Sequence, residues 1–480
     1  MSRSVLDRVM VLLVALCMTA VPVSAEDGDD DRDRGGALFV MANSTDRVRG
    51  NEVAMYTRSS NGDLSLVGYF PTGHLGTGEP QLGSGPAPTA QVLSIAFGLP
   101  LVVASADALG SANSLLLDRG HRCLFAVNAG SNTVSSFRVR RSGLDRVSVV
   151  ASRGVFPVSL TENDNVLYVL NSGGPGSLAG FRVRGNCRLS PLANSDVSLG
   201  GLADSFPLPN PGEVLTTPAQ ASFSPDGRLL VLSIKGGDAQ PGPTLPSGRI
   251  AVFPVSGSGL LGGPVVTASS ATGGTGGPFS FVFAGSRTLV VVHANSGTVG
   301  SYLVNANNTL SQIADAAIAT FAPRWIVGND QFVYTASFGA PSGVLEILGS
   351  PGLPDVNGVI NGFRIDRHGN LTDLGPDAQV EYPAPGPGRS GNHAIDISLI
   401  GRFLYFLQPR TGSVGRLTVA EDGSLSDLVN FGGLSPGLEP FVGFNPGIHN
   451  FLTRCFLQDP EAPTFSPECR LGSAQGITGY

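Results

Sequence analysis

Lysine is nearly absent from this chain of 480 residues, with Lys235 as its only example. Lysine and arginine together number 30, against 37 aspartates and glutamates, and the formal net charge is −7. A surface that binds nucleic acid carries an excess of cations to neutralise phosphates. The composition therefore argues against nucleic acid as a partner.

Helical patterns are also lacking, since no stretch shows an amphipathic helical period of useful length. Charged residues make up only 14% of the chain, while glycine reaches 65 and proline 35. After the N-terminal region no run approaches the roughly 20 apolar residues that span a bilayer. This combination predicts an all-β protein rich in turns, with no transmembrane segment in the mature chain.

The N-terminus has the pattern of a secretory signal. Arg3 and Arg8 accompany an apolar run over residues 9–20, and Val23-Ser24-Ala25 supplies small residues for cleavage. We predict a signal peptide over 1–25, a solvated acidic leader over 26–36, and a secreted or periplasmic mature protein. An uncleaved membrane anchor is the alternative, but the apolar run is short for that role.

Cysteine is scarce, and no Cys-x-x-Cys or Cys/His spacing indicates a metal site. Cys17 leaves with the signal, so Cys123, Cys187, Cys455 and Cys469 remain for an oxidising compartment. We expect Cys455 and Cys469, which are close in sequence, to form a disulfide in the C-terminal tail. This leaves Cys123 and Cys187 as the second pair, although both lie in strand-like runs about a repeat and a half apart.

An internal repeat dominates the rest of the chain. Each copy has an apolar strand, a turn of Gly, Ser or Asn, a second alternating strand and a further turn, and Leu124 and Leu167 begin equivalent strands 43 residues apart. Complete copies start at Leu124, Leu167, Leu289 and Leu404, and interrupted copies start at Phe39, Leu229 and Phe332. Seven copies of this length predict a seven-bladed β-propeller of four-stranded blades. A right-handed β-helix is the rival, but its repeats are shorter and lack the four-strand pattern.

The ends of the repeat region predict how the ring closes. The first copy, from Ala37, lacks a leading strand, and residues 440–447 resemble a leading strand with no copy of its own. We therefore expect a C-terminal strand to complete the first blade, with one propeller domain over 37–450 and a Cys- and Pro-containing tail over 451–480. Longer spacings mark insertions at 76–108, 236–248 and 339–358.

Two motifs carry a resemblance to a known family. Residues 125–139, which read FAVNAGSNTVSSFRV, and residues 223–228, FSPDGR, resemble the lactonase-type propellers. That family includes a phosphogluconolactonase and a cyclase acting on carboxymuconate, and the resemblance covers nearly all of the mature chain. It implies an enzyme that hydrolyses or forms a lactone at the mouth of the central channel. One departure stands out, because Thr217-Pro218-Ala219 occupies the place where such members carry His-Pro-His.

Candidate functional residues follow from the repeat, because the loops before the innermost strands and those after the second strands share one face. Arg324, His393 and Glu439 come from successive blades at the first of these positions. An arginine to hold an oxyanion, with a histidine and a carboxylate to move protons, suits lactone chemistry. A salt bridge in the channel is the alternative reading.

The second position forms a polar ring around the channel. Its members are Asn43, Asn128, Asn171, Ser233, His293, Ala336 and Gln408, with Arg410 just beyond; Gln220, with Asn113, Phe279 and Trp325, belongs to the first position. We predict that His293, Gln220, Asn128, Asn171, Gln408 and Arg410 bind ligand. The competing interpretation is structural, because Asn stabilises tight turns through its own backbone and a buried His finds partners.

Two functions remain open on this basis. The first is a lactone hydrolase or cycloisomerase acting on a small lactone or organic acid. The second is a non-catalytic propeller that binds a ligand or an extracytoplasmic protein. We expect a monomer that binds no cofactor. We also expect no metal site, since Asp330 and Asp396 are isolated rather than clustered carboxylates.

Overall fold

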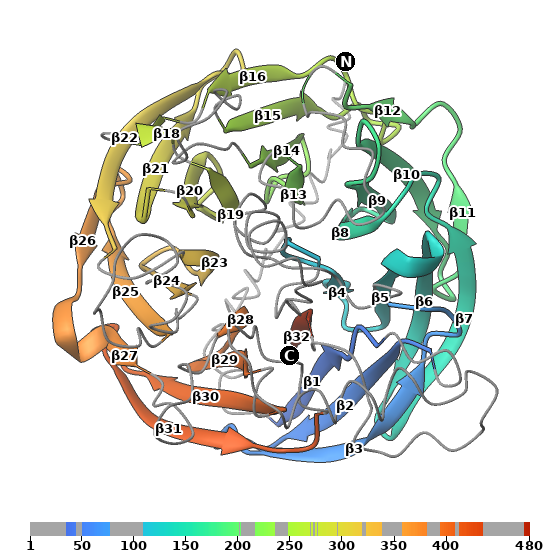
Figure 1. The fold of residues 1–480 in the computed structure, drawn as a ribbon, viewed down its shortest axis with the longest axis horizontal. Helices are drawn as coiled ribbons and strands as arrows, with labels where there is room; N and C mark the ends of the chain where they lie inside the picture. Colours follow the sequence, from blue (N-terminus) through green and yellow to red (C-terminus); the bar gives the residue numbers. More distant parts are fainter. Residues whose placement is uncertain are drawn as a thin grey trace, which may run out of the picture.

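The computed structural model describes most of the repeat region. The described residues are 35–44, 50–76, 109–200, 202, 217–235, 248–268, 270–271, 274–275, 277–294, 296–318, 323–337, 358–381, 394–408, 412–434 and 475–480. Seven antiparallel sheets stand around a common centre, and the strands of each sheet are ordered from the channel outward (Figure 1). The predicted seven-bladed β-propeller is confirmed.

The first four blades follow each other along the chain, each ordered from its inner to its outer strand. Their strands are β32 (Ile477–Gly479), β1 (Gly36–Met41), β2 (Glu52–Arg58) and β3 (Leu64–Pro71) in blade 1; β4 (Leu115–Leu117), β5 (Cys123–Asn128), β6 (Thr133–Arg140) and β7 (Gly143–Ala151) in blade 2; β8 (Pro157–Asn163), β9 (Val166–Asn171), β10 (Ser177–Val183) and β11 (Leu189–Pro191), with β12 (Val197–Ser198), in blade 3; and β13 (Pro218–Phe223), β14 (Leu229–Ile234), β15 (Arg249–Pro254) and β16 (Val265–Ala268) in blade 4.

The remaining three blades have the same order. Their strands are β19 (Pro278–Ala284), β20 (Thr288–His293), β21 (Thr298–Val304) and β22 (Leu310–Ala317) in blade 5; β23 (Pro323–Gly328), β24 (Phe332–Ser337), β25 (Val359–Ile365) and β26 (Leu371–Asp373), with β27 (Gln379–Glu381), in blade 6; and β28 (Ile395–Ile400), β29 (Phe403–Gln408), β30 (Ser413–Val419) and β31 (Leu425–Phe431) in blade 7. A small hairpin joins β17 (Ser270–Ala271) to β18 (Gly274–Thr275).

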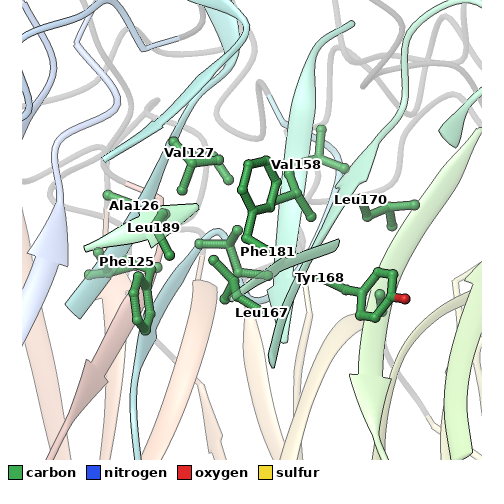
Figure 2. Packing of buried hydrophobic residues seen from close by; sticks show 14 of the residues in the cluster. Phe125, Ala126, Val127, Val158, Leu167, Tyr168, Leu170, Phe181 and Leu189 are labelled. Atoms are coloured by element: carbon green, nitrogen blue, oxygen red, sulfur yellow. The ribbon is translucent and has the colours of Figure 1, made fainter. Parts of the chain in front are cut away.

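Burial explains which sequence runs become which strands. The second strands, such as β9 and β29, are buried along their whole length, because blades cover both of their faces. Continuous apolar sequences therefore suit them. The outermost strand β31 has a free edge toward solvent, and its residues are partly buried or exposed. Figure 2 shows how apolar side chains from β5, β8 and β9 pack between blades 2 and 3.

The ring closes as a C-terminal strand pairs with the first blade, as predicted, but the strand is a different one. Ile477–Gly479 pairs with β1, with Phe39 opposite Thr478, so β32 takes the innermost place. The sequence pattern predicts residues 440–447 for that place. That segment lies outside the described residues, and the strand that closes the ring comes from the region we assigned to the tail.

A repeated joint links neighbouring blades through the turn between the third and fourth strands. A tyrosine in the second strand of one blade donates a hydrogen bond to a glycine carbonyl in that turn of the next. These pairs are Tyr168 with Gly259 at 2.9 Å, Tyr334 with Gly423 at 2.9 Å, and Tyr405 with Gly62 at 2.7 Å. Each glycine has a positive φ. In each case a Cβ would also collide with the first residue of the neighbouring second strand, so the joint requires glycine.

The disulfide occupies the same place between blades 2 and 3. Cys123 begins β5, and Cys187 has the left-handed φ of +68° that glycine has in the other turns. The two cysteines are bonded with their Cα atoms 5.4 Å apart, which confirms the predicted second pair. Cys455 and Cys469 lie outside the described residues. At the position of the joint tyrosine this blade has Phe125, which donates no hydrogen bond.

Helical structure in the described part consists of two 3₁₀ turns, η1 (Ala129–Ser131) and η3 (Gly375–Ala378). No helix among the described residues combines the length and apolar character needed to cross a membrane. The predicted signal peptide and acidic leader lie outside the described residues, as do nearly all residues of the three insertions.

Candidate functional site

The inner strands surround the central channel (Figure 1), and polar side chains on them bond the backbone of the next blade. The backbone N–H groups of Ala221 and Phe223 in β13 donate to the hydroxyls of Ser159 and Thr161 in β8. The Gln220 amide donates to the carbonyl of Phe281 and accepts from its N–H, both at 2.9 Å. These side chains hold blades together, so their polar atoms are already engaged.

A segment of residues 109–113, here called the crossing segment, contacts several blades at the channel mouth. Its backbone accepts hydrogen bonds from the Trp325 indole at 3.0 Å and from the Lys235 ammonium at 2.8 Å. Its Ala112 N–H donates to the carbonyl of Ala219. Ala219 belongs to the Thr217-Pro218-Ala219 sequence that replaces His-Pro-His, so the crossing segment packs directly over that position.

Two cations flank one aromatic ring beside the crossing segment. The Lys235 ammonium lies 5.4 Å and the Arg324 guanidinium carbon 5.5 Å from the centre of the Phe279 ring. Trp325 meets the same ring edge to face. These contacts are within the range of cation–π attraction, and they concentrate positive charge from blades 4 and 6 on one side of the mouth. The predicted site residue Arg324 therefore lies at the mouth.

Below the crossing segment the channel contains a cavity of about 310 Å³. Ala112 and Asn113 line one end of it, and Arg119 and Pro225, from turns on the opposite face, line the other. Among the described residues that line it, Asp396 is the only carboxylate. A cavity of this size suits a small ligand.

Asp396 owes its position to a β-bulge. The register of β28 shifts between Ile395 and Ile397, and Asp396 is the extra residue, with a φ of +57°. It is 6% exposed. A left-handed aspartate inside a strand carries backbone strain, and such residues cluster at functional sites.

Bulges in neighbouring inner strands do not fall at the same depth. In β23, the residue before the bulge pairs with Ser337, the last residue of its second strand. In β28, the residue before the bulge pairs with Leu407, which precedes the last residue of its second strand. Asp396 therefore lies one residue deeper in the channel than Arg324, which places it at the cavity instead of the mouth.

Asn113 lines the same cavity as Asp396. Its backbone φ is +64°, and its carbonyl accepts a hydrogen bond from Leu160. Its side-chain amide has no hydrogen bond in the described part of the chain and lines the cavity. The cavity is therefore lined by both a residue with an amide donor and a residue with a carboxylate acceptor.

The predicted ring of amides is largely engaged in local bonding. The Asn128 amide donates to Thr133 and Ser135, the Asn171 amide donates to Ser152 and Ser177, and Gln408 accepts from Ser413. These contacts favour the structural interpretation of the ring. Asn43 differs, because it is buried and neither amide atom has a partner in the described part of the chain.

His293 is the last residue of β20, and its buried ring contacts the neighbouring strand β21 of the same blade. Its ring nitrogens contact the Thr298 hydroxyl at 3.2 Å and the Tyr302 hydroxyl at 3.1 Å. Gly300 makes room for the ring, since a Cβ there would come within 2.8 Å of it. Burial lowers the pKa of His293 to about 4, opposed in part by the charge of Asp315. His293 is therefore neutral at physiological pH.

Three predicted site residues lie outside the described residues, namely His393, Glu439 and Arg410. Their roles stay predictions. Sequence reasoning noted Asp396 only as an isolated carboxylate, and Asn113 only as one member of a ring. The signal for Asp396 was its place at the start of an inner strand, but the bulge that sets its depth is not visible in the sequence. No group of three or more potential metal-ligating side chains occurs among the described residues.

Comparisons with known proteins agree on the fold. No protein-family model and no curated protein matches the chain significantly in sequence. The periplasmic gluconolactonase PpgL of Pseudomonas aeruginosa superposes with a TM-score of 0.57 at 14% identity, over 93% of this chain and 99% of that chain.

Two further solved structures are similar. A Bacteroides fragilis protein assigned by inference as a 6-phosphogluconolactonase gives a TM-score of 0.55 at 15% identity, over 83% of this chain and 94% of that chain. A Lactobacillus plantarum protein gives 0.55 at 14%, over 84% and 97%. The chain is therefore a seven-bladed propeller with the fold of these three structures, two of which are described as lactonases, and this confirms the resemblance of its motifs at the level of fold.

Proposed function

We propose that the protein hydrolyses a small lactone inside the central channel, with Asp396 as general base. The observation that carries the proposal is the buried carboxylate of Asp396. Its residue has a strained, left-handed backbone and lines a cavity of ligand size together with Asn113. The P. aeruginosa structure of the same fold adds support, because it is described as a gluconolactonase, and a carboxylate with an amide donor can perform lactone hydrolysis.

The chemistry requires one water and no other reactant. Asp396 accepts a proton from water as its oxygen attacks the lactone carbonyl carbon, and the Asn113 amide donates to the developing oxyanion. The acyl carbon–oxygen bond then breaks, and the ring oxygen takes the proton from Asp396 to become a hydroxyl. The product is a hydroxy acid, whose carboxylate is attracted by Lys235 and Arg324 at the mouth.

The second candidate is a propeller that binds an anionic ligand without turning it over. It is favoured by His293, which is enclosed and neutral, and by the Thr217-Pro218-Ala219 sequence beneath the crossing segment. In that case the Lys235–Phe279–Arg324 cluster holds the ligand and the cavity has no catalytic role.

An extracytoplasmic location accompanies both candidates. The support is the disulfide between Cys123 and Cys187, since such bonds persist in oxidising compartments. The P. aeruginosa protein of the same fold is described as periplasmic. Residues 1–25 supply the predicted signal.

The test is lactone hydrolysis by the purified chain, followed as acid release at constant pH on a panel of sugar-acid lactones. We expect Asp396→Asn to lower kcat about 10²- to 10⁴-fold, the usual contribution of a general base. Asp427→Asn is the matched control, because Asp427 also has a positive φ but lies exposed on β31.

Three outcomes are informative. Full activity in Asp396→Asn removes Asp396 as the base. Hydrolysis lost in both variants points to a folding defect, which unfolding curves detect. An inactive wild-type chain that still binds hydroxy acids, with binding weakened by Arg324→Gln, favours the second candidate.

A further inference from the structure

Arginines gather on the face of the propeller opposite the channel mouth, under blades 2 and 3. The turns between first and second strands share this face with the turns between third and fourth strands. Five arginines belong to the turns and strand ends beside the disulfide on this face; we call them the arginine patch, formed by Arg122, Arg138, Arg141, Arg184 and Arg188.

Backbone pairing places these residues together. Arg122 precedes Cys123, and Cys123 lies opposite Arg138 in the ladder between β5 and β6. The Cys187 N–H donates to the carbonyl of Arg184, and the Arg184 N–H donates to that of Arg188. Since Cys123 and Cys187 are bonded, the two groups of arginines meet at the disulfide.

No member of the arginine patch forms an ion pair within the described part of the chain. Four carboxylates share this face of blades 2 and 3, namely Asp118, Asp145, Glu162 and Asp164, and Asp145 lies opposite Arg138 in the ladder between β6 and β7. Asp145 pairs with Arg140 at 2.7 Å, and Asp118 accepts from the backbone N–H groups of Arg122 and Cys123. The five patch arginines outnumber these carboxylates in a chain of net charge −7, so the patch suits an anionic partner.

The chain carries a matching anionic segment next to this surface. Residues 26–34 contain six carboxylates and two arginines. They join the described structure at Gly35, just before β1. Gly36 touches Tyr480, and the Tyr480 ring stacks on His121 with centroids 4.6 Å apart. His121 precedes Arg122, which belongs to the arginine patch. The point where the acidic segment joins β1 is therefore linked to the patch through the contact of Gly36 with Tyr480 and the stacking of Tyr480 on His121.

We propose that the acidic segment 26–34 docks on the arginine patch of its own chain. Nine residues reach about 30 Å when extended, which is enough to cross two blades. Tethering keeps the segment at an effective concentration in the millimolar range, so weak guanidinium–carboxylate contacts suffice. Elsewhere on the same face the turns carry Asp226, Asp366 and Asp422 beside Arg228, Arg367 and Arg402, so the described residues there show no comparable excess of arginine.

The consequence is a covered surface. With the segment in place, the arginine patch is neutralised and external polyanions are excluded from it. Removing the segment exposes a basic surface on an otherwise acidic protein.

The experiment measures how fast phenylglyoxal modifies each arginine, read by peptide mass spectrometry on the chain from residue 26 onward. We expect Arg122, Arg184 and Arg188 to react roughly tenfold more slowly at low salt than in a variant with Asp27, Asp29, Asp30, Asp31 and Asp33 changed to Asn. Salt near 1 M should remove the protection in the wild type, because the Debye length then falls to about 3 Å.

Arg228, Arg367 and Arg402 are the matched control, since they are exposed in turns of the same face under other blades. Their rates should be equal in both chains. Equal rates for the patch arginines in both chains would overturn the proposal. Protection that persists in the Asn variant would also overturn it, because another occupant, such as a bound polyanion, would then cover the patch.

Discussion

His293 illustrates how burial decides the role of a single side chain. The sequence presents it as a histidine in a ring of amides, where it is predicted to bind ligand. The structure encloses it between Thr298 and Tyr302, and burial lowers its pKa to about 4. A group with so low a pKa contributes to the pH dependence of stability, and this contribution is separate from any role in ligand binding.

The expected pH dependence follows from the sign of the shift. Between pH 6.5 and 4 the histidine is protonated in the unfolded chain but stays neutral in the folded protein. The contribution of His293 to the free energy of unfolding is therefore complete above pH 6.5 and is lost as the pH falls. The free energy of unfolding should drop by roughly 2 kcal/mol between pH 7 and pH 5 from this group. In His293→Asn this drop should vanish, as measured by urea unfolding at both pH values.

His368→Asn is the control, because His368 is exposed in a turn and its replacement should leave the drop unchanged. If His293→Asn keeps the full pH dependence, the enclosed histidine is not its source. Loss of stability at pH 7 alone would report only the missing hydrogen bonds to Thr298 and Tyr302.

At the residue scale the sequence predicts which residues line the channel better than it predicts how deep in the channel each one lies. Asn128, Asn171 and Gln408 were correctly placed in one ring, but their partners are local and structural. Asp396 was not chosen, because a bulge of one residue moves it into the cavity and no local pattern marks that bulge. Gln220 likewise bonds Phe281 in the next blade, a contact 61 residues away.

At the scale of elements, the blade joint shows how one position is filled in two chemical ways. Between blades 3 and 4 it consists of Val166, Tyr168 and Gly259, and between blades 2 and 3 of Cys123, Phe125 and Cys187. The repeat made the strands predictable, because each strand has its own pattern of burial. The equivalence of the disulfide with the tyrosine–glycine joint required coordinates, since it spans two copies.

This equivalence predicts that one joint can replace the other. Cys123→Val with Cys187→Gly should lose about 4 kcal/mol of stability, the loop-closure value for the sequence separation of 64. Adding Phe125→Tyr should recover about 1 kcal/mol, because the new hydroxyl can donate to the carbonyl of residue 187. Urea unfolding of the two variants measures the difference.

Phe125→Tyr in the disulfide-bonded chain is the control. There the sulfur atoms remain and no glycine turn is present, so the added hydroxyl should bring no gain. An equal effect of Phe125→Tyr in both backgrounds would contradict the equivalence of the two joints.

At the scale of the whole molecule, closure of the ring and the candidate site depend on the same short segment. β32 completes blade 1, and Gln475 just before it accepts a hydrogen bond from the Leu109 N–H at 3.0 Å. Leu109 begins the crossing segment that forms the ceiling of the cavity. The sequence pattern predicts that a C-terminal strand closes the ring, but it indicates residues 440–447. It does not indicate β32, because a strand of three residues is too short to be recognised in a sequence.

Thr478→Pro tests this coupling, since Thr478 is the central residue of β32 and lies opposite Phe39. A proline there removes a backbone donor from the closing strand and should cost about 3 kcal/mol or more. It should also expose the edge of β1 to other chains, so that light scattering increases. Lactone hydrolysis should fall as well, because the crossing segment loses its anchor at Gln475.

Thr372→Pro is the matched control, since Thr372 is the central residue of β26, an outer strand that is also three residues long. An outer edge tolerates proline better than a closing strand, and β26 does not contact the crossing segment. We expect a smaller loss of stability there and unchanged hydrolysis. If both variants lose stability and activity to the same extent, the closing strand has no special role, and the cavity is supported by the ring as a whole.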